Sequence, residues 1–302
     1  MTESSLYHLY GFTLESELDL PEVLAAPTTA TPNARIRIGH VSPDGISHGR
    51  RVGPFVWAGP GMLWLQVPEV ARFLVTDGQE IVVDPCDGVD EDSVRVFLLG
   101  SALGSLLLQR GMVVLHGNAI SVGDGCLVCV GPSGSGKSTL AAEFMRRGYR
   151  ILADDVAPFD DQCRALPGFP RLKLWQDAAT RLNIDTEGLR SIRPNMAKFN
   201  YPLSESHFGS EPIPLRWVYV LASRPQGTLE VEALRGMDRL RPLRNNTYRF
   251  GFLEGMALRA DHLQSCGRLA SRAHVSVLTR PDRGAGPEEL VDFLLSDLDA
   301  HR

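Results

Sequence analysis

The stretch from Gly131 to Ser138 reads GPSGSGKS and matches the pattern G-x-x-x-x-G-K-[ST] at every position. An apolar run, CLVCVG, precedes it and the helix-forming segment LAAEFMRRG follows, which is the strand–loop–helix context that this pattern needs. Its glycines let backbone N–H groups turn inward around phosphate oxygens, and the helix adds the positive end of its dipole. The pattern predicts a nucleotide-binding loop made of Gly131, Ser133, Gly134, Ser135, Gly136, Lys137, Ser138 and Thr139.

Two side chains of this loop carry specific chemistry. The ammonium of Lys137 is placed to reach the β- and γ-phosphates, and the hydroxyl of Ser138 is a ligand that suits Mg²⁺. ATP and Mg²⁺ are therefore the expected cofactors. The alternative is a Gly/Ser-rich loop that matches the pattern by chance. The match at every position, with a strand before and a helix after, argues against this alternative.

Two adjacent carboxylates, Asp154 and Asp155, follow the apolar run YRILA soon after the loop. We expect that strand to lie next to the strand that leads into the loop, as in one βαβ unit. Carboxylates at the end of such a strand face the same crevice as the phosphates. One can bind Mg²⁺ while the other takes the proton from an attacking hydroxyl. The alternative is a pair of solvated aspartates in a turn.

Other candidates are weaker. His116, in VVLHGNAI, ends a strand upstream of the loop and is a candidate catalytic residue, although a lone histidine is more often structural. The run RGMDRLRPLRNNTYR offers Arg244 and Arg249 for a triphosphate or an acidic peptide, because guanidinium forks suit phosphate and carboxylate. A solvated basic face explains the same run equally well. Lys198 is a further cationic candidate of this kind.

Hydrophobic patterning predicts two parts. Residues 1–110 read as a β-rich module of short strands, including a hairpin around Asp77-Gly78, that ends in a helix starting near Asp90 or Asp92 and stopping at Gly111. Residues 111–302 alternate strands and helices and carry every motif named above. The predicted class is α/β, with a strand-rich core in the second part.

Composition excludes several classes. The formal net charge of −5 gives no reason to expect nucleic acid or an anionic membrane as a partner. Cys126 and Cys129 are three apart in an apolar strand, where they point to opposite faces, so we expect buried thiols and no metal site. The first residues lack a signal-peptide pattern and the longest apolar stretch is too short to span a membrane. A cytoplasmic location is expected.

LHGNAI, GPSGSGKST and ILADD together resemble the core of HPr kinase/phosphorylase, whose phosphate-binding loop is also followed promptly by an Ala-Asp-Asp strand. Phosphoenolpyruvate carboxykinases share that arrangement. The opening YHLYGFTLESELDLPE, the stretch LPGFPRLKLW and the stretch LRNNTYR are more similar to the HPr-kinase-like serine kinases encoded beside lasso-peptide genes. The resemblance implies an HPr-kinase-like fold, Asp154 as base, Asp155 as metal ligand and His116 in the catalytic site.

The resemblance also has a departure. HPr kinases carry a Pro-Gly-Arg loop for their phosphorylase reaction, and the nearest stretch here, IPLRWVYVLASRPQG, lacks it. The expected activity is therefore an ATP-dependent serine kinase acting on a peptide or protein, with the C-terminal serine of a lasso precursor as the expected acceptor. An HPr-type protein kinase, a small-molecule kinase, a nucleotide-binding regulator and a carboxykinase-type lyase are the alternatives. A homo-oligomer is left open.

Overall fold

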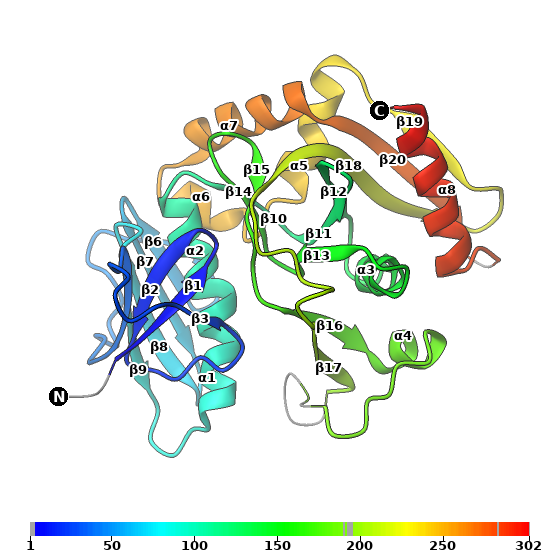
Figure 1. Ribbon diagram of the computed structural model, residues 1–302. Helices are drawn as coiled ribbons and strands as arrows, with labels where there is room; N and C mark the ends of the chain where they lie inside the picture. The colour runs from blue at the N-terminus through cyan, green and yellow to red at the C-terminus, as the bar shows by residue number, and fades with distance from the viewer. Residues whose placement is uncertain (1–3, 190, 192–195, 283, 302) are drawn as a thin grey trace. The chain divides into compact units, whose positions relative to one another are not determined.

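A computed structural model describes residues 4–189, 191, 196–282 and 284–301 as a mixed α/β protein with strand-rich sheets (Figure 1). The chain divides into two compact units. Unit 1 comprises Met1–Val114 and Thr247–Ser265, and unit 2 comprises Leu115–Asn246 and Cys266–Arg302. The sequence predicted a single boundary at residues 110 and 111. The structure differs in returning Thr247–Ser265 to the first unit, which no local pattern in that segment indicates.

Unit 1 is built on a nine-stranded sheet in the order β3-β1-β2-β4-β9-β8-β7-β6-β5. The expected hairpin at Asp77-Gly78 is present: β8 and β9 pair antiparallel from Thr76 opposite Glu80, and Asp77 and Gly78 in the turn both have positive φ. The strands are β1 (Ser5–Leu9), β2 (Phe12–Ser16), β3 (Leu24–Ala25), β4 (Ala34–Ile38), β5 (Arg50–Gly53), β6 (Val56–Gly59), β7 (Met62–Val67), β8 (Ala71–Thr76) and β9 (Glu80–Pro85).

One helical segment packs against β8 and β9 of this sheet. It begins where the acidic residues predict, because the carboxylate of Asp90 caps the helix by accepting from the backbone N–H of Ser93 at 2.7 Å. It ends before Gly111, whose φ of 75° stops the helix. The segment comprises α1 (Glu91–Phe97), the π-helical turn η1 (Leu98–Ala102) and α2 (Leu103–Gln109), and unit 1 also holds α6 (Gly251–Gly255) and the start of α7 (Arg259–Arg272).

Unit 2 contains a mixed sheet in which the strands run β14-β15-β18-β12-β11-β13, with β20 pairing β18 and β19 pairing β20. Strand β18 is parallel to β12 on one side and to β20 on the other. The strands are β11 (Gly117–Val122), β12 (Gly125–Val130), β13 (Arg150–Ala153), β14 (Ala157–Phe159), β15 (Arg164–Ala165), β18 (Ile213–Arg224), β19 (Glu230–Ala233) and β20 (His274–Pro281). A short strand, β10 (Val113–Leu115), spans the change from unit 1 to unit 2. A separate two-stranded sheet pairs β16 (Arg171–Trp175) with β17 (Lys198–Pro202).

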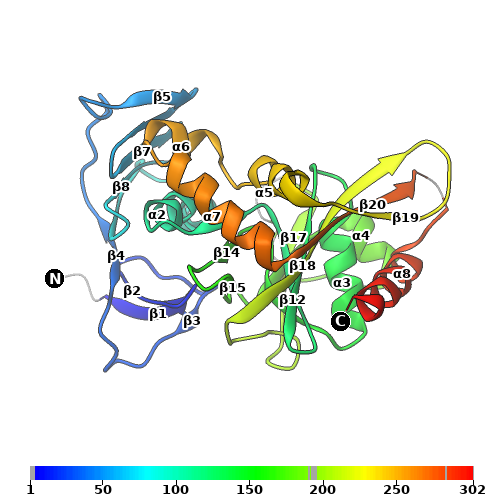
Figure 2. The ribbon, with the colours of Figure 1, turned by 90° about the horizontal axis from the view of Figure 1, so that it is seen from above.

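The core of unit 2 lies between the sheet and two helices. Leu140 and Phe144 of α3 (Lys137–Arg146) and Val291 and Leu294 of α8 (Pro287–Ala300) are buried in one cluster with the strand residue Leu127. Figure 2 shows α3 beside α8 and α4. The cysteines of CLVCVG are buried free thiols, as expected, and burial raises the pKa of Cys129 to about 12. The remaining helices are α4 (Gln176–Arg181), η2 (Gly236–Arg239) and α5 (Leu240–Asn245).

Within the described residues, the structure contains no helix with the length and apolar character required to cross a membrane.

Candidate nucleotide and phosphoryl-transfer site

The strand order brings the predicted site residues to one edge of the unit 2 sheet. We expected β13 to lie next to β12, and that expectation is wrong, because β11 lies between them and pairs antiparallel with both. The short hairpin between β11 and β12 leaves the other edge of β11 for β13. Strands β12 and β13 therefore run parallel to each other. Their C-terminal ends lie at the same end of the sheet as the first residue of β11. The loop after Val130, the aspartates after Ala153 and His116 before Gly117 therefore meet there.

The glycines of the loop are required by its backbone. Gly131 has φ 147°, and a Cβ there would lie 2.8 Å from the carbonyl oxygen of Leu221 on the neighbouring strand β18. Gly136 has φ 95° at the residue where α3 begins. Both positions exclude ordinary side chains. The loop therefore has the backbone form that directs N–H groups inward at a helix N-terminus.

Lys137 is almost fully buried at the mouth of the loop. Its ammonium donates hydrogen bonds to the carbonyl oxygens of Gly131 at 2.8 Å and Pro132 at 3.0 Å. Burial lowers the pKa of Lys137, against the opposing attraction of Asp155 and Asp154. Because the ammonium is partly removed from water, an anion bound at the loop would interact strongly with it.

Asp154 is buried, with 8% of the residue exposed. Its Oδ1 accepts a hydrogen bond from the side-chain amide of Asn118, and its Oδ2 accepts one from the backbone N–H of Lys173 at 2.5 Å. Burial raises the pKa of Asp154, and the neighbouring charge of Asp155 raises it further, against the Lys173 N–H. This carboxylate is the more basic of the two.

Asp155 has a different environment. Its Oδ2 lies 2.7 Å from the ammonium of Lys173 and its Oδ1 lies 3.2 Å from Nδ1 of His116. Burial alone would raise the pKa of Asp155, but the hydrogen bond from His116 and the charge of Lys173 outweigh it, so the pKa lies well below its usual range. Asp155 has φ 73°, a conformation uncommon outside glycine that is concentrated at functional sites.

His116 also contacts the backbone of the second aspartate. Its Nδ1 lies 3.0 Å from the carbonyl oxygen of Asp155, in addition to the carboxylate contact. Both of these partners are acceptors, so Nδ1 must carry the hydrogen. His116 therefore supports the strained conformation of Asp155 from two directions.

Two residues of the site were missed by the sequence analysis. Lys173 lies between the buried Leu172 and Leu174 of β16. This alternation predicts that the Lys173 side chain lies on the opposite face of the strand, but it does not predict which residues that side chain contacts. Asn118 is buried in β11 beside the apolar residues Ala119 and Ile120, and a polar residue in a mostly apolar strand was the available signal. Its pairing with Asp154 depends on the register of β11 and β13.

These groups line one hollow of about 650 Å³, which we call the aspartate hollow. It brings together the loop, both aspartates and the start of α4. Lys198, one of the weaker candidates, also lines it, with its ammonium 5.5 Å from the ring centre of Trp175. The lining residues are His116, Asn118, Ser133, Gly134, Gly136, Lys137, Ser138, Thr139, Asp154, Asp155, Trp175, Asp177, Ala178 and Lys198.

Neither candidate arginine is among the residues that line this hollow. Arg244 lies on α5 in unit 2 and is not part of the lining. Arg249 belongs to unit 1, where its guanidinium lies 5.5 Å from the ring centre of Tyr248 and lines a separate hollow with Phe250. The loop residues Gly131 and Ser135 adjoin the hollow as part of the same turn.

The residues present are compatible with a Mg²⁺ ion that shares its ligands with phosphate. No cluster of three or more His, Cys, Asp or Glu side chains that could hold a metal occurs in the part of the chain that the structure describes. Mg²⁺ is commonly bound through one or two carboxylates together with substrate phosphates. Asp155, kept ionised, and the hydroxyl of Ser138 line the same hollow and supply such a set.

No model of a known protein family matches this chain, and no curated protein matches it either.

Proposed function

We propose that the protein is an ATP- and Mg²⁺-dependent kinase that transfers the γ-phosphoryl group to a serine hydroxyl of a peptide or protein, on an HPr-kinase-like domain. One observation carries this proposal: Lys137 and the glycine loop line the same hollow as Asp154 and Asp155. A site that only binds nucleotide has no need of a buried carboxylate with a raised pKa beside the loop. Phosphoryl transfer does need one, to accept the proton of the attacking hydroxyl.

Asp154 is the base in this proposal. A raised pKa brings a carboxyl group closer to the pH at which it can both be ionised and accept a proton. Its two hydrogen bonds, from Asn118 and from Lys173, hold it in place and leave further lone pairs for the serine hydroxyl. The serine proton passes to Asp154, the serine oxygen bonds to the γ-phosphorus, and the bond to the β–γ bridging oxygen breaks to release ADP.

The remaining residues position and neutralise charge. Lys137 exchanges its two loop carbonyls for β- and γ-phosphate oxygens. Asp155 and Ser138 hold Mg²⁺, which when bound supplies positive charge to the transferring phosphoryl group. His116 and Lys173 orient Asp155 through the contacts described above. Catalysis by these groups is mostly positioning and charge stabilisation.

The acceptor that we propose is the C-terminal serine of a ribosomal precursor peptide. The similarity of three stretches to lasso-associated kinases supports it, and so does the chemistry of the hollow. A chain terminus can enter a narrow site, and its carboxylate suits a cation at the rim. Lys198, which lies over Trp175 in the aspartate hollow, supplies that cation and replaces Arg244 and Arg249 in this role.

The experiment incubates the protein with ATP, Mg²⁺ and a candidate precursor peptide and follows the peptide by mass spectrometry. The peptide is expected to gain one phosphate mass at its last serine, and a peptide with that serine changed to alanine is expected to gain none. Efficient phosphorylation of HPr, with the peptide left unmodified, would indicate an HPr-type protein kinase instead. Nucleotide binding without transfer to any acceptor would favour a regulator.

A further inference from the structure

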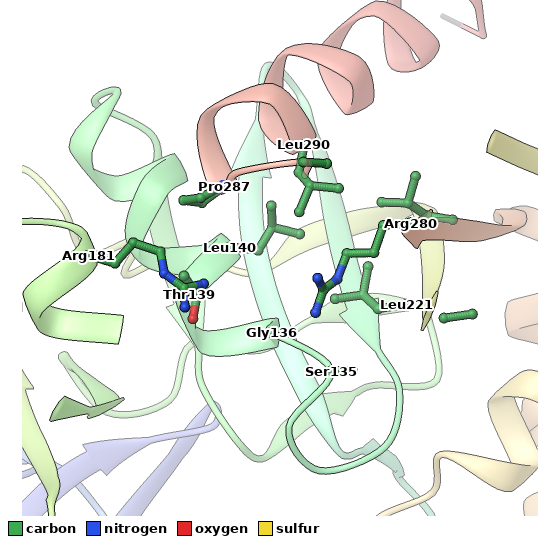
Figure 3. A pocket seen from close by; sticks show the side chains of 12 residues that line it. Ser135, Gly136, Thr139, Leu140, Arg181, Leu221, Arg280, Pro287 and Leu290 are labelled. Carbon is green, nitrogen blue, oxygen red and sulfur yellow. The ribbon is translucent and has the colours of Figure 1, made fainter. Parts of the chain in front are cut away.

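A second hollow lies against the same glycine loop, and we call it the arginine hollow (Figure 3). Counted together with the space that is open to solvent, it measures about 470 Å³. Its floor is formed by the start of α3, and its walls by the ends of β18 and β20 and the start of α8. The larger apolar side chains of the lining are Leu140, Leu221, Leu278, Pro287 and Leu290.

Two arginines, Arg181 and Arg280, reach into this hollow from opposite sides (Figure 3). Arg181 ends α4, whereas Arg280 lies in β20. The Nη2 atom of Arg280 lies 3.9 Å from the point where a Cβ on Gly136 would stand, so its guanidinium reaches the loop. Neither side chain has a hydrogen-bond or ion-pair partner among the residues that the structure describes. Two unpaired guanidinium groups offer donors to anionic and hydroxyl oxygens.

The two hollows share Gly136 and Thr139, so the loop and the start of α3 separate them. The aspartate hollow contains both aspartates and Lys137, whereas no carboxylate lines the arginine hollow among the described residues. If phosphates bind on the loop as the proposed function requires, one end of them lies at the aspartates, where transfer would take place. Their other end therefore leads away from the aspartates, toward the leucines and the arginines.

We propose that the arginine hollow binds the nucleoside of the nucleotide, with the base against the leucine wall and with Arg181 and Arg280 donating to ribose and α-phosphate oxygens. This inference rests on the proposed function, because it takes the loop as the site of the phosphates. Apolar side chains suit the faces of a base, and guanidinium groups can also stack on such a ring. The aspartate hollow is then left for the acceptor peptide.

The test compares ADP with inorganic tripolyphosphate, because only ADP carries a nucleoside. Leu290→Trp fills the hollow from α8 without changing the loop. We expect it to weaken ADP binding by about tenfold or more in calorimetry, the effect of losing one good contact surface, and to leave tripolyphosphate binding within about twofold. Leu295→Trp is the matched control, since Leu295 is a partly buried leucine of the same helix that does not line the hollow.

A second variant tests the arginines. Arg280→Ala is expected to weaken ADP binding by about tenfold, as expected for a charge-assisted hydrogen bond. Arg150→Ala, which removes an exposed arginine of unit 2 outside both hollows, is expected to change nothing. Unchanged ADP binding in both Leu290→Trp and Arg280→Ala would overturn this inference. So would equal losses of ADP and tripolyphosphate in Leu290→Trp.

The wild-type protein separates this inference from the proposed function. If it binds ADP no better than pyrophosphate, which carries the same two phosphates, the nucleoside contributes nothing and only the arginine hollow is wrongly assigned. If it binds neither compound, the loop is not a phosphate site and the proposed function fails with the inference.

Discussion

The ammonium of Lys173 lies 2.7 Å from Oδ2 of Asp155, while the backbone N–H of the same lysine donates to Oδ2 of Asp154 at 2.5 Å. A single residue of β16 therefore holds both adjacent carboxylates. Together with the hydrogen bond from His116, the cation keeps Asp155 ionised, whereas the neutral N–H orients Asp154 and lowers its pKa less than burial raises it. Two neighbouring aspartates thus acquire opposite pKa shifts, the condition under which one can bind a cation and the other a proton.

The first prediction concerns this lysine. Lys173→Met removes the cation that forms an ion pair with the partly buried Asp155, which we expect to destabilise unit 2 by about 1–3 kcal/mol at neutral pH. In the wild type the pKa of Asp155 is lowered, so its contribution to stability is complete above its unfolded pKa, near 4, and is lost as the pH falls. Urea unfolding should therefore show a difference between variant and wild type that shrinks toward pH ~3. Lys173→Arg, which keeps the charge, should lose less, and equal losses in both variants would contradict the pairing.

The second prediction concerns nucleotide affinity. Lys137→Met keeps much of the apolar stem but removes the ammonium, and we expect it to weaken binding of ATP·Mg²⁺ by about tenfold to a hundredfold. The fold should persist, because the ammonium makes hydrogen bonds only to the loop carbonyls of Gly131 and Pro132 among the described residues. Calorimetry measures the affinity and circular dichroism the fold. Wild-type affinity in a folded variant would show that this loop is not the phosphate site.

The third prediction separates the two aspartates. Asp154→Asn is nearly isosteric and should retain nucleotide binding while lowering phosphoryl transfer by about 10²–10⁴-fold, because the proton acceptor is lost. Asp155→Asn should instead raise the Mg²⁺ concentration needed for half-maximal transfer. Mg²⁺ titrations of both variants measure the division of roles. The same metal dependence in both would refute it.

The fourth prediction concerns the pH dependence of unit 1. His262 is buried, its Nε2 lies 2.9 Å from the hydroxyl oxygen of Thr247, and burial lowers its pKa from 6.5 to about 4. The folded state therefore disfavours the protonated form of His262. The free energy of unfolding is highest above pH ~6.5 and decreases as the pH falls toward 4, by about 3 kcal/mol in total. His262→Gln should flatten this loss in urea unfolding monitored across the same range. His8→Gln, at an exposed histidine of the same unit, is the control and should keep the wild-type slope.

Local chemistry was sufficient for part of the site and part of the fold. The glycine loop follows from eight consecutive residues, because its backbone form depends on glycines at particular positions. The helix start at Asp90 and the hairpin at Asp77-Gly78 are equally local, since a cap and a short turn involve only near neighbours. The aspartates could be predicted at the strand end because the apolar run before them stops there.

Which residues meet these groups was decided by the tertiary structure. Strand β11 inserts between β12 and β13 and brings Asn118 to Asp154, and β16 brings Lys173 to both aspartates. Strand pairing of this kind depends on which edges remain free after the other strands have paired, so no short window of sequence contains it. Arg280 likewise reaches the loop only because β20 pairs with β18, which itself lies beside β12, the strand that leads into the loop. The sequence determined the reactive groups, and the pairing of distant strands determined their neighbours and thereby their pKa values.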